Sequence, residues 1–322
     1  MDDHVPAVGS RFVTGRAVLL IVNPVSGGKP GSTPPLSDDV EALQPAALGK
    51  ALEARGLRVR VQALAEGDDP AEVARGVAPD EDIVVAGGDG TVGPVAEVLA
   101  GSRKTLGILA MGSWNNIARG IGIPLELEPA LDAIGRGQTM NVDTGLAWHP
   151  SSDGEGSPDD ARAFFEAAGV GLDAAGFGAV ELGGRAGWRF AIRAMWRTLR
   201  RRRTRMVLEL DGREMYARAP AVTVCIGPYH GLGFALVPDA DPADGLLDVV
   251  VFSGMSELDV VRHFLRVARG RERREPRIEV LRGRRVTVRG ARRVLPAHVD
   301  GRSLGITPVT FEVQPGSLRV FR

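Results

Sequence analysis

The sequence is poor in the residues that many metal and redox sites use. Its 322 residues include one cysteine, Cys225, so no disulfide can form within the chain, which favours a reducing compartment. Cys225 lies in an apolar run and is predicted to be a small core residue rather than a nucleophile. The five histidines are scattered, at positions 4, 149, 230, 263 and 298, and none pairs with another at the spacing of a zinc site.

Charge and hydropathy argue against two further classes of protein. Lys plus Arg and Asp plus Glu both number 40, so the formal net charge is zero, which argues against a general nucleic-acid binder. No apolar run approaches the length of a membrane span, and the N-terminus has no apolar leader segment. We therefore expect a cytoplasmic protein of ordinary globular composition with two domains.

Glycine, in contrast, is plentiful, and the most informative glycines lie in residues 83–91, which read Ile-Val-Val-Ala-Gly-Gly-Asp-Gly-Thr. An apolar, β-branched run predicts a buried strand, and the helical spacing that follows predicts a strand, turn and helix. Backbone N–H groups at such a turn bind anions, because the positive end of the helix dipole lies behind them. Thr91 is predicted to cap the helix, and its hydroxyl can also reach a phosphate. The alternative is a tight connection without a ligand. The candidate ligand-binding residues here are Gly87, Gly88, Gly90 and Thr91, with Asp89 as the catalytic candidate.

Two further turns of the same kind follow strand-like runs at residues 17–22 and 106–110. Strands that alternate with helices form parallel sheets, and such sheets bind ligands beyond the carboxyl ends of their strands. The three turns are therefore predicted to converge on one site. The first turn contributes Asn23, Ser26, Gly27, Gly28 and Lys29, and the third contributes Gly112, Ser113 and Asn115.

The pattern of predicted elements changes after Gly137. In the first half, the residue pattern predicts helices over 46–55 and 70–76 between strands. In the second half, it predicts mostly strands and one helix over 256–269. We expect a flexible tail over 1–16, an α/β domain with a parallel, Rossmann-like sheet over 17–138, and a mainly antiparallel β domain over 139–305. The second half predicts strands over 139–148, 163–170, 206–210, 218–226, 246–252, 277–281, 285–288 and 309–313.

All three turns, and residues 236–248 (Leu-Val-Pro-Asp-Ala-Asp-Pro-Ala-Asp-Gly-Leu-Leu-Asp), resemble motifs of the diacylglycerol kinase catalytic-domain family, which includes bacterial lipid kinases and sphingosine kinases. The central turn is also similar to that of the NAD kinases. The resemblance implies an ATP- and Mg²⁺-dependent kinase with a lipid acceptor. It also implies an α/β nucleotide-binding domain joined to a β-sandwich domain, with the cleft between them, and a return of residues from about 306 to 322 to the first domain. It further implies that Asp89 acts through Mg²⁺ or on the acceptor hydroxyl.

The same resemblance implies a structural Mg²⁺ in the second domain. It would be held by the Asp244 carboxylate and two carbonyl groups, for which Leu246 and Asp241 are the matching positions. The alternative is a pair of aspartate-stabilised turns without a metal.

The chain departs from the family where the family has its general base. The family reads Asp-Gly-Glu, whereas this chain reads Asp300-Gly301-Arg302, so Arg302 stands at the position of the glutamate. An arginine cannot accept a proton at neutral pH, which leaves Asp300 as an uncertain substitute. Two other family positions differ, because the chain has Gly93-Pro94 and Asn116 where carboxylates are usual. A slow lipid kinase, an NAD kinase-like enzyme and a non-catalytic nucleotide or lipid sensor all stay open.

A basic, amphipathic segment of the second half predicts contact with a membrane. Residues 185–205 contain nine arginines and no acidic residue, with apolar residues at helical spacing. Such a stripe predicts peripheral contact with an anionic membrane, although a connecting helix with a solvated basic face is an equal alternative. The sequence indicates no nucleic-acid partner. It does not fix the oligomeric state, and a homodimer is one option.

Overall fold

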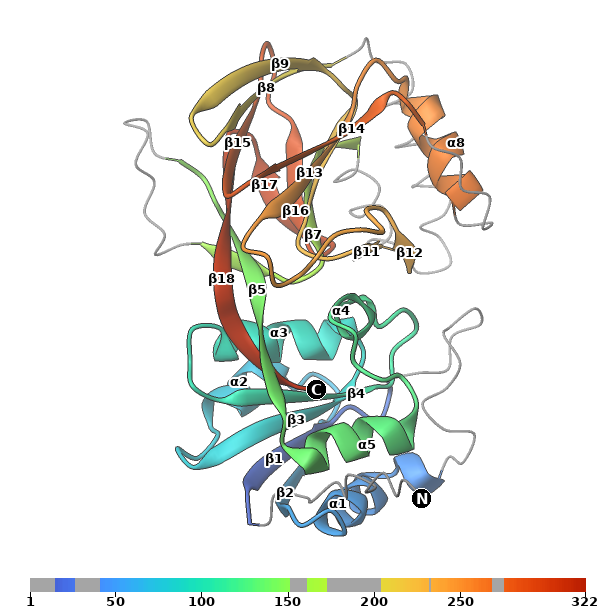
Figure 1. The fold of residues 1–322 in the computed structure, drawn as a ribbon, viewed down its shortest axis with the longest axis vertical. Helices are drawn as coiled ribbons and strands as arrows, with labels where there is room; N and C mark the ends of the chain where they lie inside the picture. Colours follow the sequence, from blue (N-terminus) through green and yellow to red (C-terminus); the bar gives the residue numbers. More distant parts are fainter. Residues whose placement is uncertain (1–14, 27–40, 151–160, 173–203, 232, 268–274) are drawn as a thin grey trace, which may run out of the picture. The chain divides into compact units, whose positions relative to one another are not determined.

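The computed structural model describes residues 15–26, 41–150, 161–172, 204–231, 233–267 and 275–322. The chain divides into two compact units, one made of residues 1–141 and 318–322 and the other of residues 142–317. Each unit has its own core, strand β18 takes part in both, and Figure 1 shows the course of the chain through them. None of the helices described is both long and apolar enough to span a membrane.

The first unit is built on a parallel sheet with the strand order β2-β1-β3-β4-β18. Only the end of β18 belongs here, where Arg319 pairs with Thr105 of β4. The likeness implied such a return of the chain end to the first domain. The strands are β1 (Ala17–Val22), β2 (Arg58–Ala63), β3 (Glu81–Gly87), β4 (Thr105–Ala110) and β18 (Val309–Phe321).

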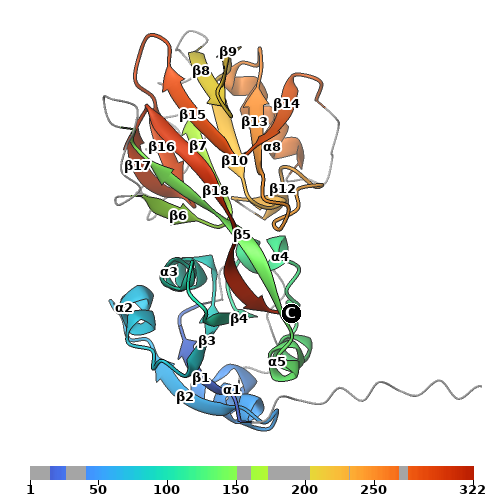
Figure 2. The ribbon, with the colours of Figure 1, turned by 60° about the vertical axis from the view of Figure 1, so that its left-hand side comes forward.

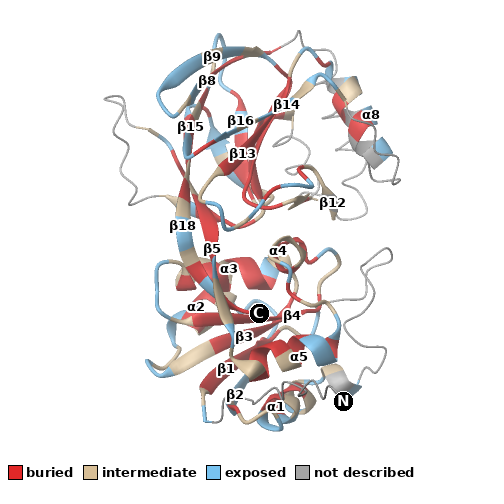
Figure 3. Ribbon diagram, in the orientation of Figure 1, coloured by how far each residue is buried: buried red, intermediate tan, exposed pale blue. Residues whose placement is uncertain are grey.

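Helices cover both faces of this sheet, which is why every residue of β1 and β4 is buried. On one face, Leu48 and Leu52 of α1 (Pro45–Glu53) and Leu131 of α5 (Leu127–Arg136) share a core with the sheet. On the other face lie α2 (Pro70–Arg75) and α3 (Asp89–Leu99), as Figures 1 and 3 show. Short helices η1 (Glu41–Leu43) and α4 (Asn116–Gly120) complete the unit. The predicted α/β class with a parallel sheet is confirmed.

The second unit is an antiparallel β-sandwich, as predicted, and Figure 2 gives a second view of its strands. Its core lies between two sheets and includes an edge-to-face pair, Phe164 and Phe311, with ring centroids 6.1 Å apart. One sheet has the order β14 (Ile278–Gly283), β13 (Leu247–Phe252), β10 (Ala221–Cys225), β7 (Ala167–Gly171), β16 (Pro296–Val299) and β17 (Arg302–Ile306). The other contains β18, β15 (Arg285–Gly290), β8 (Arg205–Leu210) and β9 (Arg213–Arg218), with β5 (Thr139–Trp148) and β6 (Arg162–Phe164) attached through β18. A separate hairpin pairs β11 (Tyr229–His230) with β12 (Phe234–Ala235).

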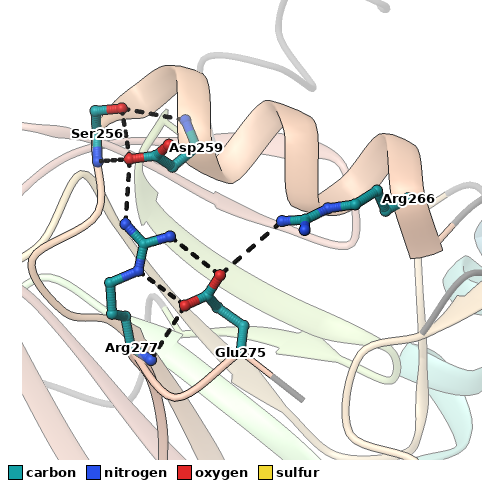
Figure 4. Close-up of polar contacts among 5 residues, drawn as sticks. All are labelled: Ser256, Asp259, Arg266, Glu275 and Arg277. Atoms are coloured by element: carbon teal, nitrogen blue, oxygen red, sulfur yellow. Dashed lines mark hydrogen bonds and ion pairs between the residues drawn. The ribbon is translucent and has the colours of Figure 1, made fainter. Parts of the chain in front are cut away.

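Helix α8 (Glu257–Val267) covers part of the sheet that contains β13, where Val260 joins a core with Phe252 and Cys225. Cys225 is thus a buried core residue, as predicted. Ser256 caps the helix, because its Oγ accepts the Asp259 N–H while an Asp259 oxygen accepts the Ser256 N–H. Figure 4 shows this cap together with the ion pairs that connect it to the chain just before β14.

The run 163–170, predicted as one strand, is two strands in different sheets, so that prediction is wrong. The chain bends at Phe165 and Glu166 because the Asp300 carboxylate accepts their backbone N–H groups, a long-range contact that local pattern cannot show. The predicted strand 218–226 begins late, since residue 218 belongs to β9. Elements that the sequence analysis did not predict include α5, β9, β16 and β17.

Candidate functional site

The three glycine-containing turns of the first unit leave neighbouring strands at the same edge of the sheet. Asn23, just after β1, donates its N–H to the carbonyl of Ala86 in β3 at 2.9 Å. Met111, just after β4, donates its N–H to the carbonyl of Gly87 at 2.9 Å. The turns therefore begin side by side, and the predicted convergence is present in the fold of this unit.

The glycines of these turns do two different things. A Cβ on Gly88 would lie 2.8 Å from the Cα of Gly112, and a Cβ on Gly87 would lie 2.8 Å from the Cβ of Thr91. Gly88 is required because the backbones of the central and third turns touch, and Gly87 because the Thr91 side chain of the same turn packs against it. Gly90 is exposed, and a Cβ there would meet no atom within 4 Å. Gly90 is therefore the glycine of the central turn at which a ligand can approach the backbone.

The start of α3 differs from the prediction. The helix begins at Asp89 with Gly88 as its N-cap, so the assignment of Thr91 as the cap is wrong. Thr91 is 3% exposed, and its hydroxyl accepts a hydrogen bond from the Asn23 side-chain amide at 2.9 Å. Asn23 and Thr91 thus join the first turn to the central one rather than facing solvent.

Asp89 connects the central turn to the third. Its Oδ2 accepts the N–H of Asn116 at 3.0 Å, and its Oδ1 accepts the N–H of Ile117 at 3.1 Å. Burial raises the pKa of the Asp89 carboxyl above its ordinary value, against the lowering effect of these donors. A carboxylate with a raised pKa is a better proton acceptor near neutral pH than an exposed aspartate.

The third turn is closed by Asn115, which has a left-handed backbone with φ 49°. Its Oδ1 accepts the Gly112 N–H at 2.8 Å, and its Nδ2 donates to the Gly112 carbonyl at 2.9 Å. Ser113 is half-buried, whereas the neighbouring Trp114 is exposed. An exposed tryptophan in a ligand-binding turn is a candidate contact that the sequence analysis missed, although its place within the motif was a signal.

The first turn is described only in part. Ser26 is half-buried and donates its N–H to the Asn23 carbonyl at 3.1 Å. Gly27, Gly28 and Lys29 lie outside the described residues.

The first unit fits a phosphate group with a divalent cation. The exposed backbone at Gly90 lies in the first turn of α3, an eleven-residue helix whose dipole favours an anion there. The adjacent Asp89 carboxylate supplies oxygen atoms, the ligand type that Mg²⁺ prefers. A site for a nucleoside triphosphate needs both of these features, an anion-binding backbone and an oxygen ligand for Mg²⁺.

Asp300, the catalytic candidate of the second unit, binds three consecutive backbone N–H groups. Its Oδ2 accepts the Phe165 N–H at 2.8 Å, and its Oδ1 accepts the N–H groups of Glu166 and Ala167 at 3.0 and 3.1 Å. Burial raises the pKa of Asp300, while these donors and the charge of Arg302 act to lower it. Both oxygens of Asp300 accept backbone N–H groups, as both oxygens of Asp89 do, so Asp300 has a structural role and its catalytic role stays a prediction. Arg302 is half-buried at the start of β17.

Two histidines that are far apart in sequence lie together in this unit. His230 and His298 are both buried, and their rings stack with centroids 6.1 Å apart and planes at 22°. No local spacing relates β11 to β16, so the stacking of the two rings could not be predicted from the sequence.

The predicted metal loop has the hydrogen bonds of aspartate-stabilised turns. Asp241 accepts the Ala243 N–H, and Asp244 accepts the Leu246 N–H, each at 3.0 Å. Asp244 also forms an ion pair with Arg282. Among the described residues, no group of three or more His, Cys, Asp or Glu side chains is placed to hold a metal ion. A site made of one carboxylate and two carbonyl groups lies outside such a side-chain cluster, so the Mg²⁺ site at Asp241, Asp244 and Leu246 stays a prediction.

Comparisons with known proteins agree with this architecture. The model of the diacylglycerol kinase catalytic domain matches residues 17–147, and that of the YegS C-terminal NAD kinase beta sandwich-like domain matches residues 170–322. A diacylglycerol kinase of Mycobacterium tuberculosis (strain ATCC 25618 / H37Rv) is 27% identical over 259 residues, which cover 78% of this chain and 79% of that protein.

Solved structures show the same fold. A putative diacylglycerol kinase from Bacillus anthracis str. Sterne matches with a TM-score of 0.68 and 22% identity, covering 97% of this chain and 98% of its own. An NAD kinase from Archaeoglobus fulgidus in complex with ATP matches with a TM-score of 0.52 and 14% identity, covering 94% and 93%. Since the two family models together span most of the sequence, the chain belongs to the diacylglycerol kinase catalytic-domain family of kinases.

Proposed function

We propose that this protein is an ATP-dependent lipid kinase that transfers the γ-phosphoryl group to the hydroxyl of a diacylglycerol- or sphingosine-like lipid. The observation that carries the proposal is the meeting of three turns at one edge of the first sheet, with the exposed Gly90 backbone beside Asp89. The relatives named diacylglycerol kinases support a lipid acceptor.

The residues of the first unit would divide the work of phosphoryl transfer among them. ATP with Mg²⁺ supplies the transferred group and neutralises its charge. The exposed backbone at Gly90, at the N-terminus of α3, binds phosphate oxygens, and Ser26 and Ser113 flank the same edge. Asp89, held in place by Asn116 and Ile117, presents a carboxylate whose raised pKa suits it to bind the cation or accept the hydroxyl proton.

Because Arg302 stands where the family has its general base, we also propose that the kinase turns over slowly. Arg302 remains protonated at neutral pH, so it cannot take the acceptor proton. General-base assistance typically contributes about 10²–10⁴-fold to a rate. A guanidinium at this position instead suits a phosphate or carboxylate group of ATP or substrate.

Two alternatives have specific support. An NAD kinase-like activity is favoured by the fold neighbour named as an NAD kinase. A non-catalytic nucleotide or lipid sensor is favoured by the absence of a glutamate at position 302. Peripheral contact with an anionic membrane remains a prediction for residues 185–205, of which 185–203 lie outside the described residues.

The test is incubation of the purified protein with γ-labelled ATP, Mg²⁺ and a panel that contains diacylglycerol, sphingosine and NAD. We expect label in a lipid product, and at least about 10²-fold slower labelling, or none, with the Asp89→Asn variant. Label in NADP alone would establish the NAD kinase-like alternative. ATP binding by calorimetry without any labelled product would identify the sensor.

A further inference from the structure

Arg282 lies between two aspartates of the second unit. It is directly opposite Asp248 in the antiparallel pairing of β14 with β13, and its Nε lies 3.2 Å from Asp248 Oδ1. Its Nη2 forms an ion pair with Oδ2 of Asp244, in the loop that precedes β13. One guanidinium therefore bridges a strand carboxylate and a loop carboxylate.

The rest of this loop is also bound by groups of the chain itself. Asp143, a buried residue of β5, accepts the Gly245 N–H through Oδ2 and the Gly316 N–H through Oδ1, both at 2.7 Å. The Asp143 N–H in turn donates to the Pro242 carbonyl at 2.8 Å. The loop is thus fixed to β5 by hydrogen bonds and to β14 by an ion pair, and the same Asp143 carboxylate binds β18.

The negative charges of Asp244 and Asp248 are compensated by the guanidinium of Arg282. Asp244 and Asp248 have side chains that are 22% and 6% exposed, so two partly desolvated carboxylates lie within reach of one guanidinium. Without a positive charge the two would repel each other, and a buried carboxylate needs a paired charge. A divalent cation on Asp244 would have to lie beside the guanidinium that already binds the same oxygen, and like charges at that separation repel strongly.

We propose that Arg282 is the resident cation of the loop 241–246 and takes the place that family likeness gives to Mg²⁺. The second unit would then hold this loop without a divalent metal. The argument depends only on contacts within the second unit, so it is independent of the proposed function.

The decisive measurement is thermal unfolding of the full chain without nucleotide or lipid, in EDTA and in millimolar MgCl₂. We expect the wild-type Tm to agree within about 1 °C, because a ligand raises Tm only when it binds the folded state. A rise in Tm with Mg²⁺ that is lost in Asp244→Asn would overturn the proposal. A rise that persists in Asp244→Asn places the metal elsewhere and leaves the loop without one.

The Arg282→Gln variant gives a second, opposite expectation. Its Tm should fall in EDTA and rise again with MgCl₂, because the vacated carboxylates of Asp244 and Asp248 then accept a divalent cation. The matched control is Arg289→Gln, which removes an arginine of similar exposure (46% against 48%) that pairs with the single carboxylate of Glu214. It should show no Mg²⁺ dependence. If Arg282→Gln keeps the wild-type Tm in EDTA, the proposal fails. If Arg282→Gln does not fold, Arg282→Lys should fold without Mg²⁺, since it keeps the charge.

Discussion

The Asp89 carboxylate accepts the backbone N–H of Asn116 at 3.0 Å, so the aspartate of the central turn fixes the start of α4. In the second unit the Asp300 carboxylate does the same for three consecutive N–H groups beginning at Phe165. Both aspartates with a predicted catalytic role therefore also have a structural one. Activity measurements on their variants are informative only beside a measurement of folding.

Asp89→Asn is expected to lower kcat by about 10²–10⁴-fold, the usual contribution of a general base, or to abolish it if the carboxylate also binds Mg²⁺. The Tm should change little, because a neutral amide avoids the cost of a buried charge although it loses one acceptor. The control is Asp69→Asn, since Asp69 is also an aspartate of the first unit that accepts a backbone N–H, that of Ala71. Full activity in Asp89→Asn would show that Asp89 has no catalytic role.

The pH dependence of the wild type gives a second test of Asp89. Because burial raises its pKa, the ionised form needed for catalysis should be lost at a higher pH than for an exposed aspartate, whose pKa is about 3.9. We expect the acid limb of kcat against pH to lie above that value. An acid limb at or below about pH 4 would contradict the assignment.

Gly90→Ala should separate ligand approach from folding. A Cβ there meets no atom within 4 Å, so the folded protein should keep its Tm or gain slightly, while ATP affinity in calorimetry should fall about tenfold, or 1.4 kcal/mol. The control is Gly93→Ala in the same helix, where a Cβ would make only an ordinary contact with Ile117 at 3.9 Å. Gly88→Ala should instead lower the Tm, because its Cβ would lie 2.8 Å from Gly112. If the ATP affinity of Gly90→Ala is unchanged, ATP does not bind at the backbone of the central turn.

The sequence was most informative where structure is local. Local patterns predicted β1 and β5 with their observed bounds, because such a strand is defined by consecutive residues. It failed where a partner distant in sequence decides the conformation. The bend between β6 and β7 depends on Asp300, and the pairing of His230 with His298 depends on the sandwich topology. Glycine patterns located the three turns but did not distinguish Gly90, open to a ligand, from Gly88, needed for packing.

The ion pairs around α8 predict a pH-dependent stability. Arg277 pairs with Glu275 at 2.8 Å and with Asp259 at 3.3 Å (Figure 4). The hydrogen bond to Arg277 lowers the pKa of Glu275, and hydrogen bonds from Ser256 lower that of Asp259. A lowered folded pKa means that the stabilisation is fully present above the unfolded carboxyl pKa, near 4, and is lost as pH falls through the lower folded value.

We therefore expect Arg277→Gln to lower the Tm at neutral pH, and the difference from the wild type to shrink as the pH falls below about 4 toward the lowered folded pKa values. Arg136→Gln, which removes one positive charge from α5, controls for net charge and should show no such convergence. A constant difference in Tm between Arg277→Gln and wild type from pH 7 to pH 3 would show that these ion pairs do not stabilise the fold.

Arg302→Glu tests why this chain should be a slow kinase. Restoring a carboxylate at the base position is expected to raise kcat on diacylglycerol by about 10²-fold or more, if the missing base limits the rate. Arg302→Gln separates the two parts of the change, because it removes the guanidinium without adding a proton acceptor. It should leave kcat low.

Folding must be checked in both variants, since the charge of Arg302 lowers the pKa of the buried Asp300 and its loss should raise it further. Equal Tm values for Arg302→Gln and Arg302→Glu would allow their kinetics to be compared directly. If the wild type already turns over at about 1–100 s⁻¹, as ordinary kinases do, and the glutamate variant is no faster, then the base lies elsewhere. In that case the arginine is better explained as a binding group for an anionic part of ATP or substrate, and Arg302→Gln should then raise KM rather than lower kcat.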